Sequence, residues 1–252
     1  TISAVCRLPI DGPEIVTLLC DLEPLSRSPE DEDYATFWLV VADQLHRRGI
    51  ASDAPKNAIA VIDDGSSLET LQTLGMEPAD LRKRQRNLAK LRNVLTDPPQ
   101  PKQRKTLKRP QKLLLEKGQV YAYPVDSSGK CINPYFTDDT RPAFTQKRWG
   151  AFLVVNTGHA LDYLAWYELA RSRRMTKRKP SLGRATAGVD LTKRRVGTTT
   201  AVHITRMQLE LLGSVEVATQ PEPSEADTVR ATAADISNAN FLSKWSFPGT
   251  FR

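Results

Sequence analysis

The stretch TDPPQPKQRKTLKRPQK, from Thr96 to Lys112, separates two parts of the sequence that have different hydrophobic patterns. It contains four prolines and shows no hydrophobic periodicity. Proline lacks a backbone N–H, so this segment suits neither a helix interior nor a central strand. At the polyproline rise of about 3.1 Å per residue, it reaches on the order of 50 Å. The sequence therefore predicts a domain boundary here, formed by a linker or by a strap that lies along the surface.

The part before this stretch has helical patterns. Residues 31–49 begin with acidic side chains, end with basic ones and close on Gly49, as the helix dipole and a left-handed glycine cap favour. The apolar residues between them recur at helical spacing: Phe37, Val40, Val41 and Leu45. Shorter helices are predicted around Lys56–Asp63 and after Ser66. The longest helix begins at Pro78 and carries a single leucine stripe: Leu81, Leu88, Leu91 and Leu95.

The part after Lys112 has strand patterns. The run QVYAYPV, Gln119–Val125, is rich in aromatic and β-branched residues and is followed by a Ser-Ser-Gly turn. The further expectations are strands at Cys131–Phe136 and Ala151–Asn156, a strand or helix at Ala160–Leu169, a loop over 171–195, a helix over 198–212 and a short strand over 215–217.

These patterns together predict an α+β protein. Its aromatic residues are densest between Tyr121 and Tyr167, where they are expected to fill the core of a small barrel, or alternatively to recognise a partner from the surface. The predicted parts are a helical domain over 1–95, a basic proline-rich linker or strap over 96–112, a small β-barrel-like module with an extra helix over 113–217, and a partly flexible tail over 218–252.

Composition and spacing argue against several classes of protein. The three cysteines, Cys6, Cys20 and Cys131, are widely spaced and imply no disulfide framework, which favours a reducing compartment. No run approaches the 18 apolar residues of a membrane span, and the N-terminus has no secretion signal. We therefore expect a cytoplasmic protein that does not contact a membrane. The sequence gives no oligomeric state.

Catalytic and metal-binding signatures are missing from the sequence. It contains no nucleophile elbow, phosphate-binding glycine loop or dinucleotide fingerprint, and its three histidines are scattered. Cys131, His159 and Asp162 make a triad only on paper, because a triad is defined by geometry. The paired carboxylates Asp63-Asp64 and Asp138-Asp139 fit solvated charge better than acid–base catalysis. We predict a protein without enzymatic activity, cofactor or metal.

Positive charge is concentrated in two windows. Residues 81–117 hold 13 lysines and arginines against two carboxylates, and residues 171–195 hold 10 against Asp190 alone, in a chain of net charge +7. Such segregation predicts an anionic partner, either an acidic protein surface or nucleic acid. No aromatic residue lies between Leu81 and Gln119, so this window has no stacking platform for single strands. The candidate binding residues are Arg82, Lys83, Arg86, Lys90, Lys102, Arg104, Lys105, Lys108, Arg109, Arg173, Arg174, Lys177 and Arg178.

The run EKGQVYAYPV, Glu116–Val125, resembles the opening of a bacterial immunity-protein family encoded beside polymorphic toxins. Its members read Gly-Asp-hydrophobic-Phe-x-hydrophobic-Pro before a turn and a strand; here the match spans Gly118 to Val125, and Gln119 stands where Asp is usual. The segments FWLV at 37–40, IDDGS at 62–66 and LRKR at 81–84 also look like an uncharacterised bacterial helical-plus-barrel family.

This resemblance implies a small β-barrel and a stoichiometric inhibitor that binds a toxin and blocks it, and it implies no catalytic residue. The first hypothesis is therefore a non-enzymatic binding protein of the immunity type, whose partner is a cognate toxin or effector. The alternative is an accessory or regulatory protein that binds nucleic acid through the basic helix and the strap.

Overall fold

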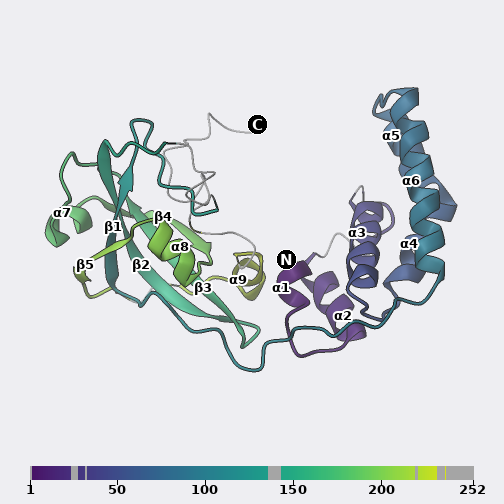
Figure 1. Cartoon of the computed structure of the whole chain (residues 1–252), viewed down its shortest axis with the longest axis horizontal. Coiled ribbons are helices and arrows are strands. Elements are labelled where there is room, and N and C mark those ends of the chain that lie inside the picture. Colours follow the sequence, from purple (N-terminus) through teal and green to yellow (C-terminus); the bar gives the residue numbers. More distant parts are fainter. Residues whose placement is uncertain are drawn as a thin grey trace. The chain divides into compact units, whose positions relative to one another are not determined.

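The computed structural model describes residues 2–23, 28–31, 33–135, 143–218, 221–231 and 236. The chain divides into two compact units, Ile2–Lys108 and the chain from Arg109 onward. The described part of the first unit is helical, and an antiparallel sheet dominates the second (Figure 1). The predicted α+β class is therefore confirmed.

The first unit is built from α1 (Ile2–Val5), α2 (Gly12–Leu22), α3 (Tyr34–Arg47), α4 (Ala54–Asp64), α5 (Ser66–Thr73) and α6 (Pro78–Thr96). Local signals set several of their ends. At the start of α2, Asp11 and Glu14 each accept the other's backbone N–H, at 2.9 and 2.8 Å, in a capping box. After α3, Gly49 has φ of 70° and the N–H of Ile50 donates to the Leu45 carbonyl at 3.0 Å, which is a Schellman cap. The predicted glycine cap is confirmed.

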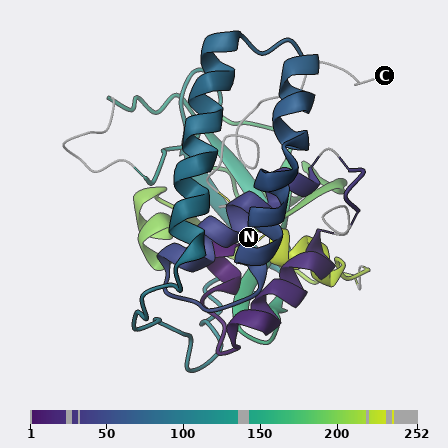
Figure 2. The same cartoon turned by 90° about the vertical axis from the view of Figure 1, so that its right-hand side faces the viewer.

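Packing within the first unit follows the predicted apolar stripes in part: on α3, Val41 and Leu45 are buried, whereas Val40 is exposed. Helix α4 packs against α3, and α6 runs beside α4 and α5 (Figure 2). Of the predicted stripe on α6, Leu88 and Leu95 are buried, and Leu81 and Leu91 are half-buried. The buried stripe therefore fixes which side of α6 faces the unit and which side faces solvent.

The second unit contains β1 (Gln119–Val125), β2 (Arg148–Ala160), β3 (Leu164–Ser172), α7 (Leu182–Thr186), β4 (Val189–Gly197), α8 (Ala201–Arg206), β5 (Glu210–Ser214) and α9 (Glu225–Ala231). The strand order is β4-β3-β2-β1-β5, and every neighbouring pair is antiparallel. Among the described residues, β4 and β5 each pair on one side only, so the sheet is open. The expectation of a barrel was wrong, because the two edge strands do not meet.

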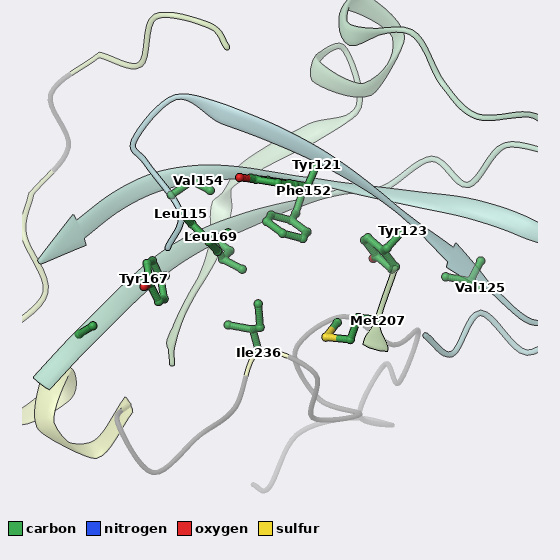
Figure 3. Packing of buried hydrophobic residues seen from close by; sticks show 11 residues of the cluster. Leu115, Tyr121, Tyr123, Val125, Phe152, Val154, Tyr167, Leu169, Met207 and Ile236 are labelled. Carbon is green, nitrogen blue, oxygen red and sulfur yellow. The ribbon is translucent and has the colours of Figure 1, made fainter. Parts of the chain in front are cut away.

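Both faces of the sheet are covered. On one face the aromatic rings of Tyr121, Tyr123, Phe152 and Tyr167 pack with Met207 and other apolar side chains (Figure 3). On the other face a second cluster forms around Val120, Leu153, Val155, Ala170 and the α7 residue Ala185. Alternate residues of the central strands therefore face different clusters, which explains why β1 and β3 are buried almost throughout.

Several predicted strands and loops differ from the structure. Cys131 forms only an isolated bridge with Val125, and the next residues turn, so no strand begins there within the described residues. The predicted loop over 171–195 contains α7 and most of β4. Strand β4 escaped prediction because it is an edge strand: five of its nine residues are polar or charged and only two are buried, which removes the alternation.

The helix predicted over 198–212 is also too long. Helix α8 ends at Arg206, because Gln208 adopts a left-handed φ of 54° and the N–H of Leu209 donates back to the Ile204 carbonyl. The chain then enters β5, so the short strand expected over 215–217 lies earlier. The predicted tail contributes α9 and buried Ile236 to the second unit, and the rest of it lies largely outside the described residues.

Candidate interaction surfaces

The strap, residues 96–112, is hydrogen-bonded to the first unit along its first half. The Nζ atom of Lys102 donates to the Arg47 carbonyl at 2.8 Å, at the end of α3. The N–H of Leu107 donates to the Arg7 carbonyl at 2.7 Å. These bonds join segments far apart in sequence, so the first half of the strap is part of the first unit's fold.

Arg104 anchors the same half of the strap. Its guanidinium donates to the carbonyls of Leu8 and Ile10, and its side chain is half-buried. A guanidinium can satisfy two carbonyls at once because it carries five N–H donors in a planar fork. Lys102 and Arg104, both predicted to bind a partner, therefore hydrogen-bond backbone carbonyls of the chain itself.

The second half of the strap is bonded to the second unit through Gln111. Its N–H donates to the Tyr163 carbonyl at 2.9 Å, and its side-chain oxygen accepts the N–H of Ala165 at 3.0 Å. Its carbonyl accepts a hydrogen bond from Nε2 of His159 at 2.6 Å. Since a carbonyl oxygen only accepts, this contact assigns the proton to Nε2 and gives His159 a structural role.

The solvent side of α6 carries four of the predicted cations. Successive residues of an α-helix are turned by about 100°. From the buried line of Leu88 and Leu95, this rotation places the four on the opposite side of the helix, where all are exposed. Over eight residues the group rises about 12 Å along the axis. These residues are called the α6 face below: Arg82, Lys83, Arg86 and Lys90.

Repulsion among the positive charges of the α6 face destabilises helix α6. Arg82 and Arg86, and Arg86 and Lys90, are four residues apart, and like charges at that spacing destabilise a helix by about 0.2–0.5 kcal/mol per pair. Of the other α6 arginines, Arg92 forms a bidentate pair with Asp63 at 2.6 and 3.0 Å, which lowers the pKa of that carboxyl. No described acidic side chain forms such a pair with the α6 face.

The remaining predicted cations fall into two groups. Lys105 and Lys108, on the strap, are exposed and belong to the first unit, whereas exposed Arg109 begins the second. The others follow β3 in the second unit, where Arg174, Lys177 and Arg178 are exposed. The predicted binding residues therefore belong to two separate units.

Arg173, also predicted to bind a partner, is paired inside the chain. It donates to the carboxylate of buried Asp190, which also accepts the hydroxyl of Thr192 at 2.6 Å. The hydrogen bond from Thr192 and that from Arg173 lower the pKa of Asp190 to about 2. Asp190 and Arg173 therefore link the ends of β3 and β4.

A buried carboxylate lies on the neighbouring part of the sheet. Glu168 of β3 is 5% exposed, and its nearest cation is Nε of Arg194 at 3.3 Å from Oε1. Its other oxygen, Oε2, is buried without a hydrogen-bond partner among the described residues. Burial raises the pKa of Glu168, and Arg194 offsets part of that rise.

An open groove of about 870 Å³ lies in the first unit. Its apolar lining comes from α3, α4, α5 and the turn before α6, and four carboxylates and one guanidinium also line it. No sequence pattern predicted the groove, because its walls come from segments spread between residues 29 and 84. The residues at its wall are Pro29, Glu30, Asp31, Asp33, Tyr34, Ala35, Thr36, Leu39, Ala60, Val61, Asp64, Leu71, Leu74, Met76 and Arg84.

The structure does not form a catalytic triad from Cys131, His159 and Asp162. Cys131 bridges Val125, which pairs with Arg148 at one end of β2, whereas His159 lies near the other end. Eleven residues of strand separate those ends by about 36 Å.

The described residues also contain no group of three potential metal ligands. Asp138-Asp139 lie outside the described residues. None of the described helices is long and apolar enough to cross a membrane.

Most of the Gly118–Val125 match, which carries the family resemblance, is buried. Gly118 has φ of 88°, and a Cβ there would lie 2.5 Å from the Val215 carbonyl oxygen. Every residue of Val120–Val125 is buried. These residues therefore specify the packing of β1, and Gln119 is the one side chain of the Gly118–Val125 match that is partly exposed.

Comparisons with protein-family models, with curated proteins and with solved structures found no match for this chain. The resemblance to immunity proteins stays a prediction, and the candidate surfaces are defined by the contacts of this chain alone.

Proposed function

We propose that this chain is a stoichiometric binding protein of the immunity type, which neutralises an effector protein by covering its functional surface. The observation that carries the proposal is the α6 face. Its four cations point away from the packed side of the helix, have no described acidic partner and repel one another along the helix. An acidic surface on the effector relieves that repulsion when it binds, and charge complementarity of this kind speeds association.

An acidic protein surface suits the α6 face better than a single nucleic-acid strand does. No aromatic side chain lies between Leu81 and Gln119 to stack on bases. Lys102 and Arg104 belong to the same basic window of the sequence. Both donate hydrogen bonds to backbone carbonyls of the first unit. The α6 face itself is therefore a compact patch of charge on one helix.

Nucleic-acid binding is the second candidate, and one observation favours it. Lys105, Lys108 and Arg109 are exposed, so three cations follow one another along the strap. Lysine and arginine at this density neutralise phosphates and release counterions. A binder that makes about 6–10 phosphate contacts loses about 10³–10⁵ in affinity between 50 and 200 mM salt.

The test is co-expression with the product of the gene beside the one that encodes this chain. We expect a 1:1 complex that survives size-exclusion chromatography and cells that survive the neighbour's toxicity. Binding of the purified chain to a 20-base-pair duplex and to single-stranded RNA is measured in parallel across the same salt range. No complex and no protection, together with steeply salt-dependent binding to either nucleic acid, would favour the second candidate.

A further inference from the structure

The groove of the first unit combines an apolar floor with an acidic rim. Leu39 and Val61 lie at its base and are buried, whereas Leu74 stands at its edge with 75% of its surface exposed. A leucine that exposed on a wall that also includes Leu71 and Met76 leaves apolar surface in water. The groove therefore favours a ligand that brings apolar atoms.

The carboxylates of the rim are of two kinds. Asp31 and Asp33 precede α3, where the helix dipole favours negative charge, so their presence has an ordinary structural cause. Asp64 ends α4, where the dipole disfavours negative charge, and lies two residues before α5, where the dipole favours it. Its neighbour Asp63 is compensated by Arg92, but no described side chain forms an ion pair with Asp64. Asp64 is thus an exposed carboxylate that lies at the groove and has no ion-pair partner among the described side chains.

We propose that this groove binds a cationic amphipathic peptide segment of a protein partner. An apolar side chain of the segment lies against Leu74 and the floor, and its lysine or arginine side chains reach Asp33 and Asp64. The groove has a volume of about 870 Å³, which is larger than a single ion fills. A purely ionic ligand would also leave the apolar wall in contact with water. Arg84, also at the wall, disfavours a segment whose charge is spread evenly along its length.

This site is separate from the α6 face in position and opposite to it in charge. Its ligand is cationic, whereas the partner proposed for the α6 face is anionic. Failure of either proposal therefore leaves the other standing, since different variants and different probes test them.

The experiment measures binding of a fluorescent 12-residue peptide in which leucines at helical spacing alternate with lysines. The full chain is compared with the double variant Asp64→Asn, Leu74→Ala. Both substituted residues are exposed, and Asp64 forms no ion pair with a described side chain, so the variant is expected to melt close to the wild-type temperature. We expect its peptide affinity to fall about 10- to 50-fold.

The matched control is Glu69→Gln, Val40→Ala, which removes an exposed carboxylate and an exposed apolar side chain outside the groove. Its affinity is expected to stay within about twofold of wild type. Equal weakening in both double variants would overturn the site. A peptide with serine in place of leucine that binds as tightly, or displacement of the peptide by equimolar spermidine, would show a purely ionic site and would overturn the amphipathic ligand.

Discussion

At the scale of single residues, Arg104 and Lys105 show why neighbouring cations have different roles. The Arg104 guanidinium bonds two carbonyls, whereas Lys105 is exposed and has no described partner. Replacing Arg104 by alanine leaves those carbonyls without their charged donor, and hydrogen bonds to charged groups contribute about 1.5–3 kcal/mol. We expect Arg104→Ala to lower the free energy of unfolding of the first unit by about that amount, measured by urea denaturation.

The matched change at the next residue is Lys105→Ala, for which a shift within about 0.5 kcal/mol is expected. Equal losses in the two variants would contradict the structural role of Arg104. If Arg104→Ala is as stable as wild type but loses partner binding, Arg104 is a binding residue, as the sequence predicted.

Glu168 gives a pH-dependent prediction at the same scale. Burial raises the pKa of Glu168 above that of the unfolded chain, so in the window between the two values the folded state holds a proton that the unfolded state releases. The free energy of unfolding contributed by this group therefore falls as pH rises from about 4.3 through the raised pKa. Glu168→Gln is expected to remove that decline, as measured by urea denaturation from acid to neutral pH.

The sign of that result separates two accounts of Glu168. If burial dominates, Glu168→Gln is at least as stable as wild type at neutral pH. If the pair with Arg194 dominates, the variant loses stability at neutral pH and not in acid, and the stated direction of the pKa shift is contradicted.

At the scale of elements, local signals predicted some segments and not others. The range of β1 was predicted at both ends, and the cap at Gly49 was correct, because each depends on a few neighbouring residues. Strand β4 was missed because an edge strand needs no apolar alternation. The length of α8 was missed because a left-handed glutamine ends it where no glycine marks the end.

The candidate interaction surfaces were also predicted only where they depend on local sequence. Helical spacing places the four cations of the α6 face on the side opposite Leu88 and Leu95, as the sequence alone allows. The internal roles of Lys102 and Arg104 depend on carbonyls tens of residues away, and the groove depends on four helices meeting. Such long-range arrangements leave no local pattern in a single sequence.

At the scale of the whole molecule, the strap belongs to the folded units rather than to a free linker. A fragment that ends at Lys108 keeps the bonds of Lys102, Arg104 and Leu107, whereas one that ends at Thr96 loses them. At about 0.5–1.5 kcal/mol for each of these four hydrogen bonds, the longer fragment is expected to be about 2–6 kcal/mol more stable. Urea denaturation of fragments 2–108 and 2–96 measures the difference. Equal stabilities would mean that the strap contributes nothing to the fold.

The proposed function requires that the α6 face bind an acidic protein partner. The direct measurement is the affinity of this chain for the product of the neighbouring gene, by calorimetry, for wild type and for the variant R82E/K83E/R86E/K90E. The control R174E/K177E/R178E/K193E changes the net charge equally at exposed residues of the second unit. If the α6 face binds this partner, the α6 variant loses at least 100-fold in affinity, about 0.7 kcal/mol for each of its four cations, and the control changes within about fivefold. Equal losses in both variants, or an α6 variant that binds as wild type does, would contradict it.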